Sequence, residues 1–200
     1  MHDDETIKFA PESSGIDRLI LRRWSPRAFS DKPVDGEDLK KLFLAASWAP
    51  SCFNEQPWRF IVGRQGDGIY ERIGEILLGV NRQWATTAPV LLLSTAKRTL
   101  TRDGRPNPCH FHDVGLASAM LTVQATALGL YAHGMAGFDR QLARTAFNVP
   151  DDFDLCATWA VGHLGNPDTL PEPLRTHEKG PRSRKPLHEF VFSGWDKPAF

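Results

Sequence analysis

The stretch APSCFNEQPWRF, residues 49–60, is the most informative segment of the chain, because it places a stiff polar loop between an expected helix and an expected strand. Asn54 and Gln56 each carry a hydrogen-bond donor and an acceptor, which suits the polar edge of a heteroaromatic ring. Pro50 and Pro57 stiffen the segment. Loops of this kind often hold binding residues, although an ordinary tight turn explains the composition equally well.

Two further segments are rich in arginine and serine. The first is RRWSPRAF, residues 22–29, and the second is RSRK, residues 182–185. The guanidinium group is a forked donor that fits a phosphate, and a serine hydroxyl adds another donor. In a chain of zero net charge, two such clusters predict one bound anion held from two sides. Salt bridges to the 24 acidic residues, or simply a solvated basic turn, are the alternatives.

Through these three segments, the chain resembles the nitroreductase family of FMN-dependent oxidoreductases. The resemblance also rests on Asn81 ahead of the apolar run PVLLL, residues 89–93, and on GMAGFD, residues 134–139. The segments follow the family's order and usual spacing over most of residues 16–191. Each motif is short, but all of them in order form a specific pattern.

The resemblance implies an α+β fold of the nitroreductase type, with a central mixed β-sheet flanked by helices. Residues 1–200 are expected to form a single domain. It would include an N-terminal extension over about residues 1–15 and a C-terminal arm over about residues 186–200. The arm would wrap around a second copy of the chain, since the family builds homodimers. Four aromatic residues after Pro186 favour such a contact, because a monomer rarely leaves so many exposed. The arm could also fold back onto its own subunit.

The resemblance also implies which residues bind FMN. Those expected to do so are Arg23, Trp24, Ser25, Arg27, Pro50, Ser51, Cys52, Asn54, Asn81, Met135, Ala136, Gly137, Arg182 and Arg184. The arginines at 23, 182 and 184, with Ser25, would hold the phosphate. Arg27 and Asn81 would face the ribityl chain and the pyrimidine edge. Residues 50–54 would line the ring system from the partner subunit, and a backbone N–H near Gly137 would lie close to flavin N5.

The family's activity is a ping-pong transfer of electrons from NADH or NADPH, through FMN, to nitroaromatics, quinones or related small-molecule acceptors. The flavin supplies the redox chemistry, so no catalytic acid, base or nucleophile of the protein is expected. Two positions depart from the family's pattern: Ala136 stands where many members have an acidic residue, and Trp84 where several have a basic one. A flavin-binding or sensing module without turnover remains an alternative. So does a flavoenzyme of the same fold with dehalogenase or unsaturated-bond reductase chemistry.

Composition sets limits on the class of protein. Zero net charge gives no reason to expect nucleic acid or an anionic membrane as a partner. No apolar run approaches the roughly 20 residues that span a bilayer, and the acidic start, MHDDE, lacks the apolar core of a secretory signal. A cytoplasmic protein is therefore expected.

Cysteine and histidine give no metal or disulfide pattern. Cys52, Cys109 and Cys156 are an odd and scattered set, so a disulfide framework is not expected. A reactive thiol at Cys52 is conceivable but is not needed for the chemistry. His110 and His112 alternate, yet no third ligand is apparent, so a role at the start of a helix is preferred and no metal is expected.

The expected elements alternate between helices and strands. Apolar periodicity and capping residues predict helices over 16–21, 36–48, 69–80, 113–128 and 140–147, and strands over 58–62, 89–94, 130–136 and 155–161. Asp35 and Asp139 are expected N-caps and Gly129 an expected C-cap residue. The polar segment 97–109 is a flap or a surface excursion. The absence of a G-x-G-x-x-G motif disfavours a Rossmann domain.

Overall fold

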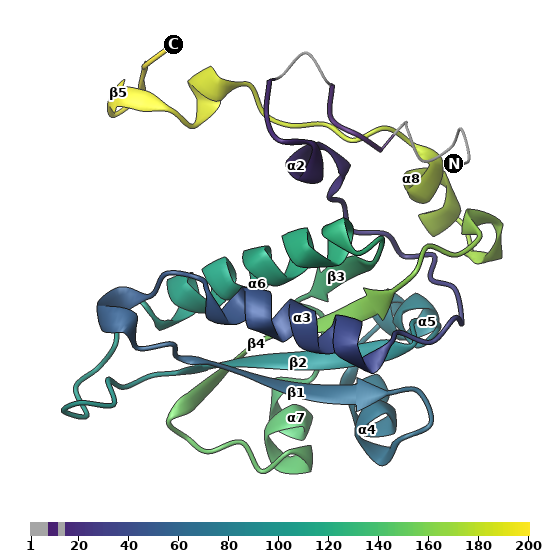
Figure 1. Ribbon diagram of the computed structural model, residues 1–200, viewed down its shortest axis with the longest axis horizontal. Coiled ribbons are helices and arrows are strands. Elements are labelled where there is room, and N and C mark those ends of the chain that lie inside the picture. Colours follow the sequence, from purple (N-terminus) through teal and green to yellow (C-terminus); the bar gives the residue numbers. More distant parts are fainter. Residues whose placement is uncertain (1–7, 12–14) are drawn as a thin grey trace.

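A four-stranded sheet forms the centre of the computed structural model, which describes residues 8–11 and 15–200. The strands are β1 (Trp58–Arg64), β2 (Val90–Lys97), β3 (Tyr131–Met135) and β4 (Phe153–Gly162). Their order across the sheet is β1-β2-β4-β3 (Figure 1). The α+β class expected from the sequence is confirmed.

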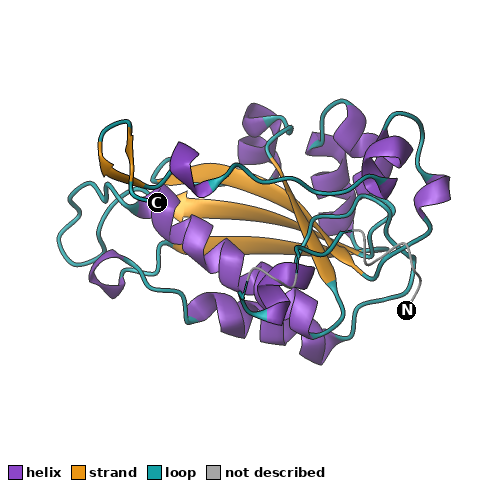
Figure 2. Cartoon of the chain, turned by 90° about the horizontal axis from the view of Figure 1, so that it is seen from above, coloured by secondary structure: helices purple, strands orange, loops and turns teal. Residues whose placement is uncertain are grey.

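Helices cover both faces of this sheet (Figures 1 and 2). One face packs against α3 (Gly36–Ser47) and α6 (His110–Ala127), and the other against α4 (Gly68–Ile76), α5 (Val80–Ala85) and α7 (Arg140–Ala146). The short helices α2 (Arg18–Arg22) and α8 (Leu174–Lys179) lie outside these layers, and η3 (Pro167–Thr169) precedes α8. No helix within the described residues is long and apolar enough to cross a bilayer.

The expectation of a mixed sheet is wrong, because all three strand pairings in the described sheet are antiparallel. Helix α6 connects β2 to β3, and such a crossover normally joins parallel neighbours. Here β4 lies between β2 and β3 and runs opposite to both. The two strands joined by the crossover therefore share a direction without pairing.

The local signals at helix ends are confirmed. Asp35 Oδ1 accepts a hydrogen bond from the Glu37 amide at 2.8 Å, and Asp139 Oδ1 accepts one from the Leu142 amide at 2.9 Å. Gly129 follows α6 with a φ of +70°, a conformation that glycine adopts without strain.

Two expected helices have different bounds. The helix expected over 69–80 is split, because α4 ends at Ile76 and α5 begins at Val80 after Gly79, whose φ is +54°. Helix α6 begins at His110 rather than Asp113.

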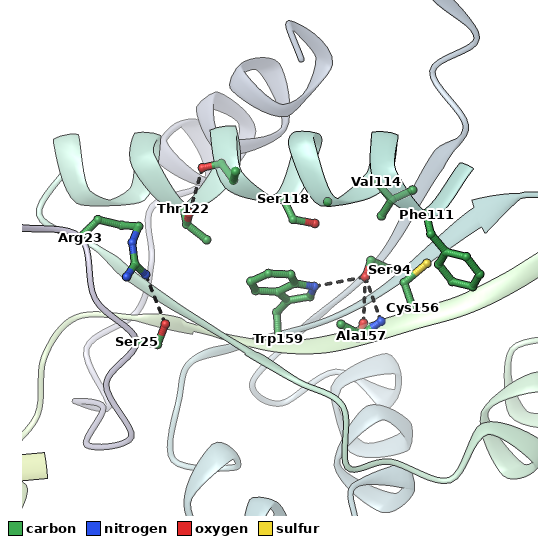
Figure 3. Close-up of a pocket in the computed structure, with 13 residues that line it drawn as sticks. Arg23, Ser25, Ser94, Phe111, Val114, Ser118, Thr122, Cys156, Ala157 and Trp159 are labelled. Carbon is green, nitrogen blue, oxygen red and sulfur yellow. Dashed lines mark hydrogen bonds between the residues drawn. The ribbon is translucent and has the colours of Figure 1, made fainter. Parts of the chain in front are cut away.

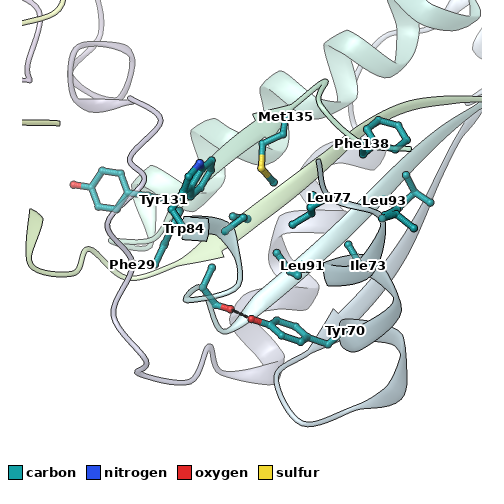
Figure 4. Close-up of a cluster of buried hydrophobic side chains, with 14 of the residues drawn as sticks. Phe29, Tyr70, Ile73, Leu77, Trp84, Leu91, Leu93, Tyr131, Met135 and Phe138 are labelled. Carbon is teal, nitrogen blue, oxygen red and sulfur yellow. Dashed lines mark hydrogen bonds between the residues drawn. The ribbon is translucent and has the colours of Figure 1, made fainter. Parts of the chain in front are cut away.

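Two buried clusters hold the layers together. The cluster under α4, α5 and α7 contains Ile73, Leu91 and Trp84, all at most 1% exposed (Figure 4). The Tyr70 hydroxyl, buried beside it, donates to the carbonyls of Thr86 and Ala88 at 2.8 and 2.7 Å. The second cluster lies between the sheet and α3 and α6. Burial of apolar side chains on both faces fixes the register of the sheet.

The two ends of the chain differ. Most of the expected N-terminal extension, residues 1–7 and 12–14, lies outside the described residues. Lys8 is only 5% exposed, however, and the Ala10 amide donates to the Leu21 carbonyl at 3.0 Å. After Pro186, η4 (Leu187–Glu189) leads to a small hairpin of β5 (Phe192–Gly194) and β6 (Lys197–Pro198). This arm leaves Trp195 91% and Phe200 84% exposed.

Candidate functional site

The two arginine clusters, far apart in the sequence, line one cavity of about 260 Å³. Arg23, Ser25 and Arg27 come from the segment after α2, and Arg182 and Arg184 from the segment after α8. We call this the arginine cavity; its walls also include Lys8, Trp24, His177, Glu178 and Pro181.

Arg182 ties the two segments together. Its Nη1 donates to the Arg23 carbonyl at 2.5 Å and its Nη2 to the Leu21 carbonyl at 2.6 Å, while its Nε is buried without a hydrogen-bond partner. Arg23 Nη1 in turn donates to Ser25 Oγ at 3.3 Å. Arg182 therefore has a structural role in addition to the binding role expected from the sequence.

The arginines crowd together without ion-pair partners. Burial and the nearby Arg184 lower the pKa of Arg23, and burial, Arg23 and Arg184 lower that of Arg182. None of the ion pairs among the described residues includes an arginine of this cavity. The salt-bridge alternative thus does not describe these side chains, and the cavity is suited to an anion.

One buried carboxylate, Glu178, lies at this cavity and is only 4% exposed. Its Oε1 accepts hydrogen bonds from the backbone amides of Arg27 and Ala28 at 2.8 and 3.0 Å. Lys8 Nζ lies nearby and donates to the His177 carbonyl at 2.9 Å. Burial lowers the pKa of Lys8, which Glu178 partly offsets. Neither Glu178 nor Lys8 is predicted from the sequence, because a single charged residue in a charged stretch carries no pattern.

Trp24 and Trp84 are core residues. Trp24, an expected cofactor ligand, is 7% exposed and meets Tyr131 edge-on at 6.0 Å between ring centroids, so its side chain forms a wall of the cavity. Trp84 is 1% exposed and stacks on Phe29 at 6.3 Å. The guanidinium of Arg27 lies 5.9 Å from the Trp84 ring. Trp84 therefore supports Arg27 from the core.

His133 on β3 also contacts the expected site, although the sequence does not predict it. Its Nδ1 donates to the Pro26 carbonyl at 2.8 Å, and its ring lies 4.6 Å from that of Trp84. Burial lowers the pKa of His133 to about 4, with Arg27 acting in the same direction and the Pro26 carbonyl opposing it. A neutral imidazole therefore fixes the loop that carries Ser25 and Arg27.

The glycine segment after β3 lies against Asn81. Asn81 Nδ2 donates to the Gly137 carbonyl at 3.2 Å, and a Cβ on Gly137 would come within 2.7 Å of that nitrogen. A side chain at this position would push the Asn81 amide away and break its hydrogen bond to Gly137. Ala136 is exposed. Met135 is 3% exposed with its side chain in the core (Figure 4), so only its backbone can reach a ligand.

A longer cavity of about 520 Å³ runs along α6 (Figure 3). Arg23 and Ser25 lie at one end, and Phe111 and Cys156 at the other. Between them, Trp159 Nε1 donates to Ser94 Oγ at 3.2 Å. The α6 residues facing the cavity are Val114, Gly115, Ser118, Ala119 and Thr122. The small side chains of Ser118 and Ala119, together with Gly115, therefore line open space.

The 50–54 turn does not reach the arginine cavity within one chain. The segment after α3, which contains η2 (Cys52–Asn54), lies at the opposite end of the molecule from α8 (Figure 1). The Cys52 amide donates to Asp113 Oδ2 at 3.0 Å, and Ser51 Oγ accepts from the Gln56 amide at 3.1 Å. Asn54 has a φ of +56°. Pro50, Ser51, Cys52 and Asn54 are thus grouped together but apart from the other expected ligands.

The loop after β2 lines neither cavity. Thr99 and Pro106 form a β-bridge across it, and His110 at its end contacts the Asn107 carbonyl through Nδ1 at 2.7 Å and Asp154 Oδ2 through Nε2 at 2.9 Å. Within the part of the chain that the structure describes, no three histidine, cysteine or acidic side chains are grouped to hold a metal.

Comparison with known proteins identifies relatives of this chain. Residues 20–83 match the model of the Nitroreductase family. A 15.4 kDa protein of Mycolicibacterium smegmatis, described as uncharacterized, is 37% identical over 148 residues, which are 70% of this chain and 99% of that protein. The chain belongs to the nitroreductase family.

Solved structures confirm the nitroreductase fold. A structure described as an oxidoreductase containing FMN is 37% identical and superposes with a TM-score of 0.85, over 90% of this chain and 91% of that one. A nitroreductase family protein from Clostridium difficile 630 is 27% identical with a TM-score of 0.68, over 88% of this chain and 95% of that one.

Proposed function

We propose that this nitroreductase-family chain binds FMN and transfers electrons from NADH or NADPH to nitroaromatics, quinones or related acceptors by a ping-pong mechanism. The observation that carries the proposal is the arginine cavity, in which arginines from both ends of the chain meet and none forms an ion pair among the described residues. The solved oxidoreductase that contains FMN and is 37% identical to this chain supports the choice of cofactor.

The arginine cavity fits the terminal phosphate of FMN. The Nε of Arg182 is buried without a partner, and such an unpaired donor costs about 1–3 kcal/mol. A phosphate oxygen would supply acceptors to Arg23, Ser25 and Arg184. Because FMN ends in one phosphate and the chain lacks a dinucleotide motif, FMN is preferred over FAD.

The residues around Gly137 fit the ring system. The missing side chain of Gly137 and the exposed backbone of Ala136 allow close approach, so that a backbone N–H can face flavin N5. Arg27 and Asn81 supply polar groups for the ribityl chain and the pyrimidine edge. Bound FMN supplies hydride acceptance and donation, while the protein's groups orient it and exclude water.

We further propose that the functional unit is a homodimer, with residues 50–54 of each chain lining the flavin held by the other. This accounts for the separation of the turn from the arginine cavity. A dimer would also cover the side chain of Phe111 on α6 and the aromatic side chains of the C-terminal arm, which are exposed to solvent in the single chain.

Extraction of the cofactor tests the assignment. Purified protein reconstituted with an equal mixture of FMN and FAD, washed and then denatured, is expected to release FMN alone in chromatography. Release of FAD, or of no flavin, would contradict the proposal. Steady oxidation of NADH or NADPH with a quinone or nitroaromatic acceptor then separates an enzyme from a flavin-binding module, which would show one reduction and no turnover.

A further inference from the structure

Two free cysteines from distant loops meet at the start of α6. Cys52 lies in η2, and Cys109 is the residue that directly precedes α6. Both are partly exposed, and the two side chains lie close enough to interact. Nothing in the sequence pairs these residues, because their spacing fits no known motif.

Asp113 holds the backbone around both thiols. Its carboxylate accepts from the Cys52 amide at 3.0 Å, and its own amide donates to the Cys109 carbonyl at 2.9 Å. Asp113 is 2% exposed, so the pairing rests on a fixed element and not on a chance contact between flexible side chains.

Two more contacts fasten the same loops together. The Thr101 amide donates to Glu55 Oε1 at 2.7 Å, and the Arg102 guanidinium lies 4.0 Å from the Phe53 ring. The loop after β2 is therefore attached to the 51–56 turn through Thr101 and Arg102, in addition to the contact of Asp113 with Cys52. This arrangement keeps the two sulfur atoms near one another.

We propose that Cys52 and Cys109 form a reversible redox modification site, in which a hydroperoxide such as hydrogen peroxide converts the two thiols to a disulfide that ties the loop to the turn. One sulfur attacks the peroxide, so that the O–O bond breaks, a sulfenic acid forms and water leaves. The second thiol then attacks that sulfur, the S–S bond forms and a second water leaves. The two thiols lose two electrons, and the peroxide gains them.

The surrounding groups set the rate of this reaction. Desolvation raises the pKa of the Cys52 thiol, as do Cys109 and Asp113, while Arg102 lowers it. Because the thiolate is the nucleophile, oxidation is expected to be slow at pH 7 and several-fold faster at pH 9. The third cysteine is an internal control, since burial and Asp154 raise the pKa of Cys156 to about 12.

Peptide mapping tests the pairing directly, with no need for flavin or activity. Trypsin leaves the three cysteines on separate peptides, residues 42–59, 103–140 and 145–175. After treatment with hydrogen peroxide, the wild-type protein is expected to yield the 42–59 and 103–140 peptides joined, and its free thiols fall from three to one. Dithiothreitol should restore all three.

Matched variants give the controls. Cys156→Ser is expected to form the same joined peptide, whereas Cys52→Ser and Cys109→Ser, which remove one thiol with little change in volume, should form none. Joined peptides that contain Cys156, a bond between two chains, or three thiols that stay reduced or pass to sulfinic acid would each overturn the pairing.

Limited digestion tests the restraint on the loop. Arg102 is exposed, and trypsin can cut the native protein after it. Cleavage there is expected to slow several-fold in the oxidised wild-type protein, and to be unchanged by peroxide in Cys109→Ser. Equal rates in oxidised and reduced wild-type protein would overturn the proposal that the disulfide ties the loop to the turn.

Discussion

The carboxylate of Glu178 accepts a hydrogen bond from the backbone amide of Arg27 at 2.8 Å, across 151 residues of sequence. The same oxygen accepts from the Ala28 amide at 3.0 Å. A single buried acid therefore positions the backbone from which Arg27 projects, and it does so without pairing with any arginine of the cavity. Its hydrogen bonds to amides leave the surrounding cations available to an outside anion.

Replacement of Glu178 should destabilise the fold. Glu178→Ala leaves two amides, one of them at the buried Ala28, without their acceptor, which costs about 1–3 kcal/mol for a buried group. Urea unfolding of wild type and variant measures the loss. Glu75→Ala, at an exposed position on α4, is the control and should change the free energy of unfolding by less than about 0.5 kcal/mol. Equal stability of the two variants would contradict the structural role of Glu178.

Loss of a cavity arginine should weaken flavin binding. Arg23→Ala and Arg184→Ala would each remove a proposed charge-assisted contact to the phosphate, worth about 1.5–3 kcal/mol, or roughly 10- to 150-fold in the Kd for FMN. Fluorescence titration of the flavin measures the Kd. Arg72→Ala, on the exposed side of α4, is the matched control. If all three variants bind FMN equally, the phosphate assignment is wrong.

Arg182 should differ from Arg184 in a second measurement. The Arg182 guanidinium donates to the carbonyls of Arg23 and Leu21, whereas Arg184 is exposed and donates only to the adjacent Ser183 carbonyl among the described contacts. Arg182→Ala is therefore expected to lower both flavin affinity and the free energy of unfolding of the apoprotein, by about 1–3 kcal/mol for the latter. Arg184→Ala should lower affinity alone. A stable Arg182→Ala apoprotein would show that the backbone contacts contribute little.

The low pKa of His133 gives the protein a specific sensitivity to acid. The native imidazole titrates at about 4, while an unfolded histidine titrates near 6.5, so between these values the unfolded chain binds more protons. The contribution of the neutral His133 to the free energy of unfolding is fully present above about pH 6.5. It falls as the pH drops toward 4, by up to roughly 3 kcal/mol. Urea unfolding at pH 7 and pH 4 measures the loss in wild type and in His133→Gln. The variant should lose less, because both proteins share every other titrating group; equal losses would contradict the burial of a neutral His133.

A mixture of defective chains can test the shared site. Chains that carry Arg184→Ala, tagged differently from chains that carry Asn54→Ala, are expected to form mixed dimers with one intact and one doubly defective site. The isolated mixed dimer should bind one FMN tightly per two chains, and each parent dimer none at the same concentration. If each site lies within one chain, the mixed dimer has no intact site.

The C-terminal arm calls for a separate measurement. A chain truncated after Lys185 loses the exposed Phe190, Phe192, Trp195 and Phe200, and sedimentation should show a weaker dimer than for the intact protein. An unchanged dimer would leave the arm without a part in assembly, while a monomeric intact protein with full flavin occupancy would rule out the shared site.

The sequence determined the features that depend on neighbouring residues. Local signals in the sequence predicted the N-caps Asp35 and Asp139 and the glycine that follows α6, Gly129. These features could be predicted because the hydrogen bonds of a cap or a turn are made within a few residues of it. The order of the motifs also identified the family.

Only the tertiary structure decided which distant groups meet. The insertion of β4 between β2 and β3 made the sheet antiparallel, and the bond from Glu178 to Arg27 and the burial of Trp84 depend on long-range packing. The pairing of Cys52 with Cys109 likewise follows from Asp113, which holds both loops. Local propensity carries no information about such contacts, because their free energy comes from groups that the fold brings together across most of the chain.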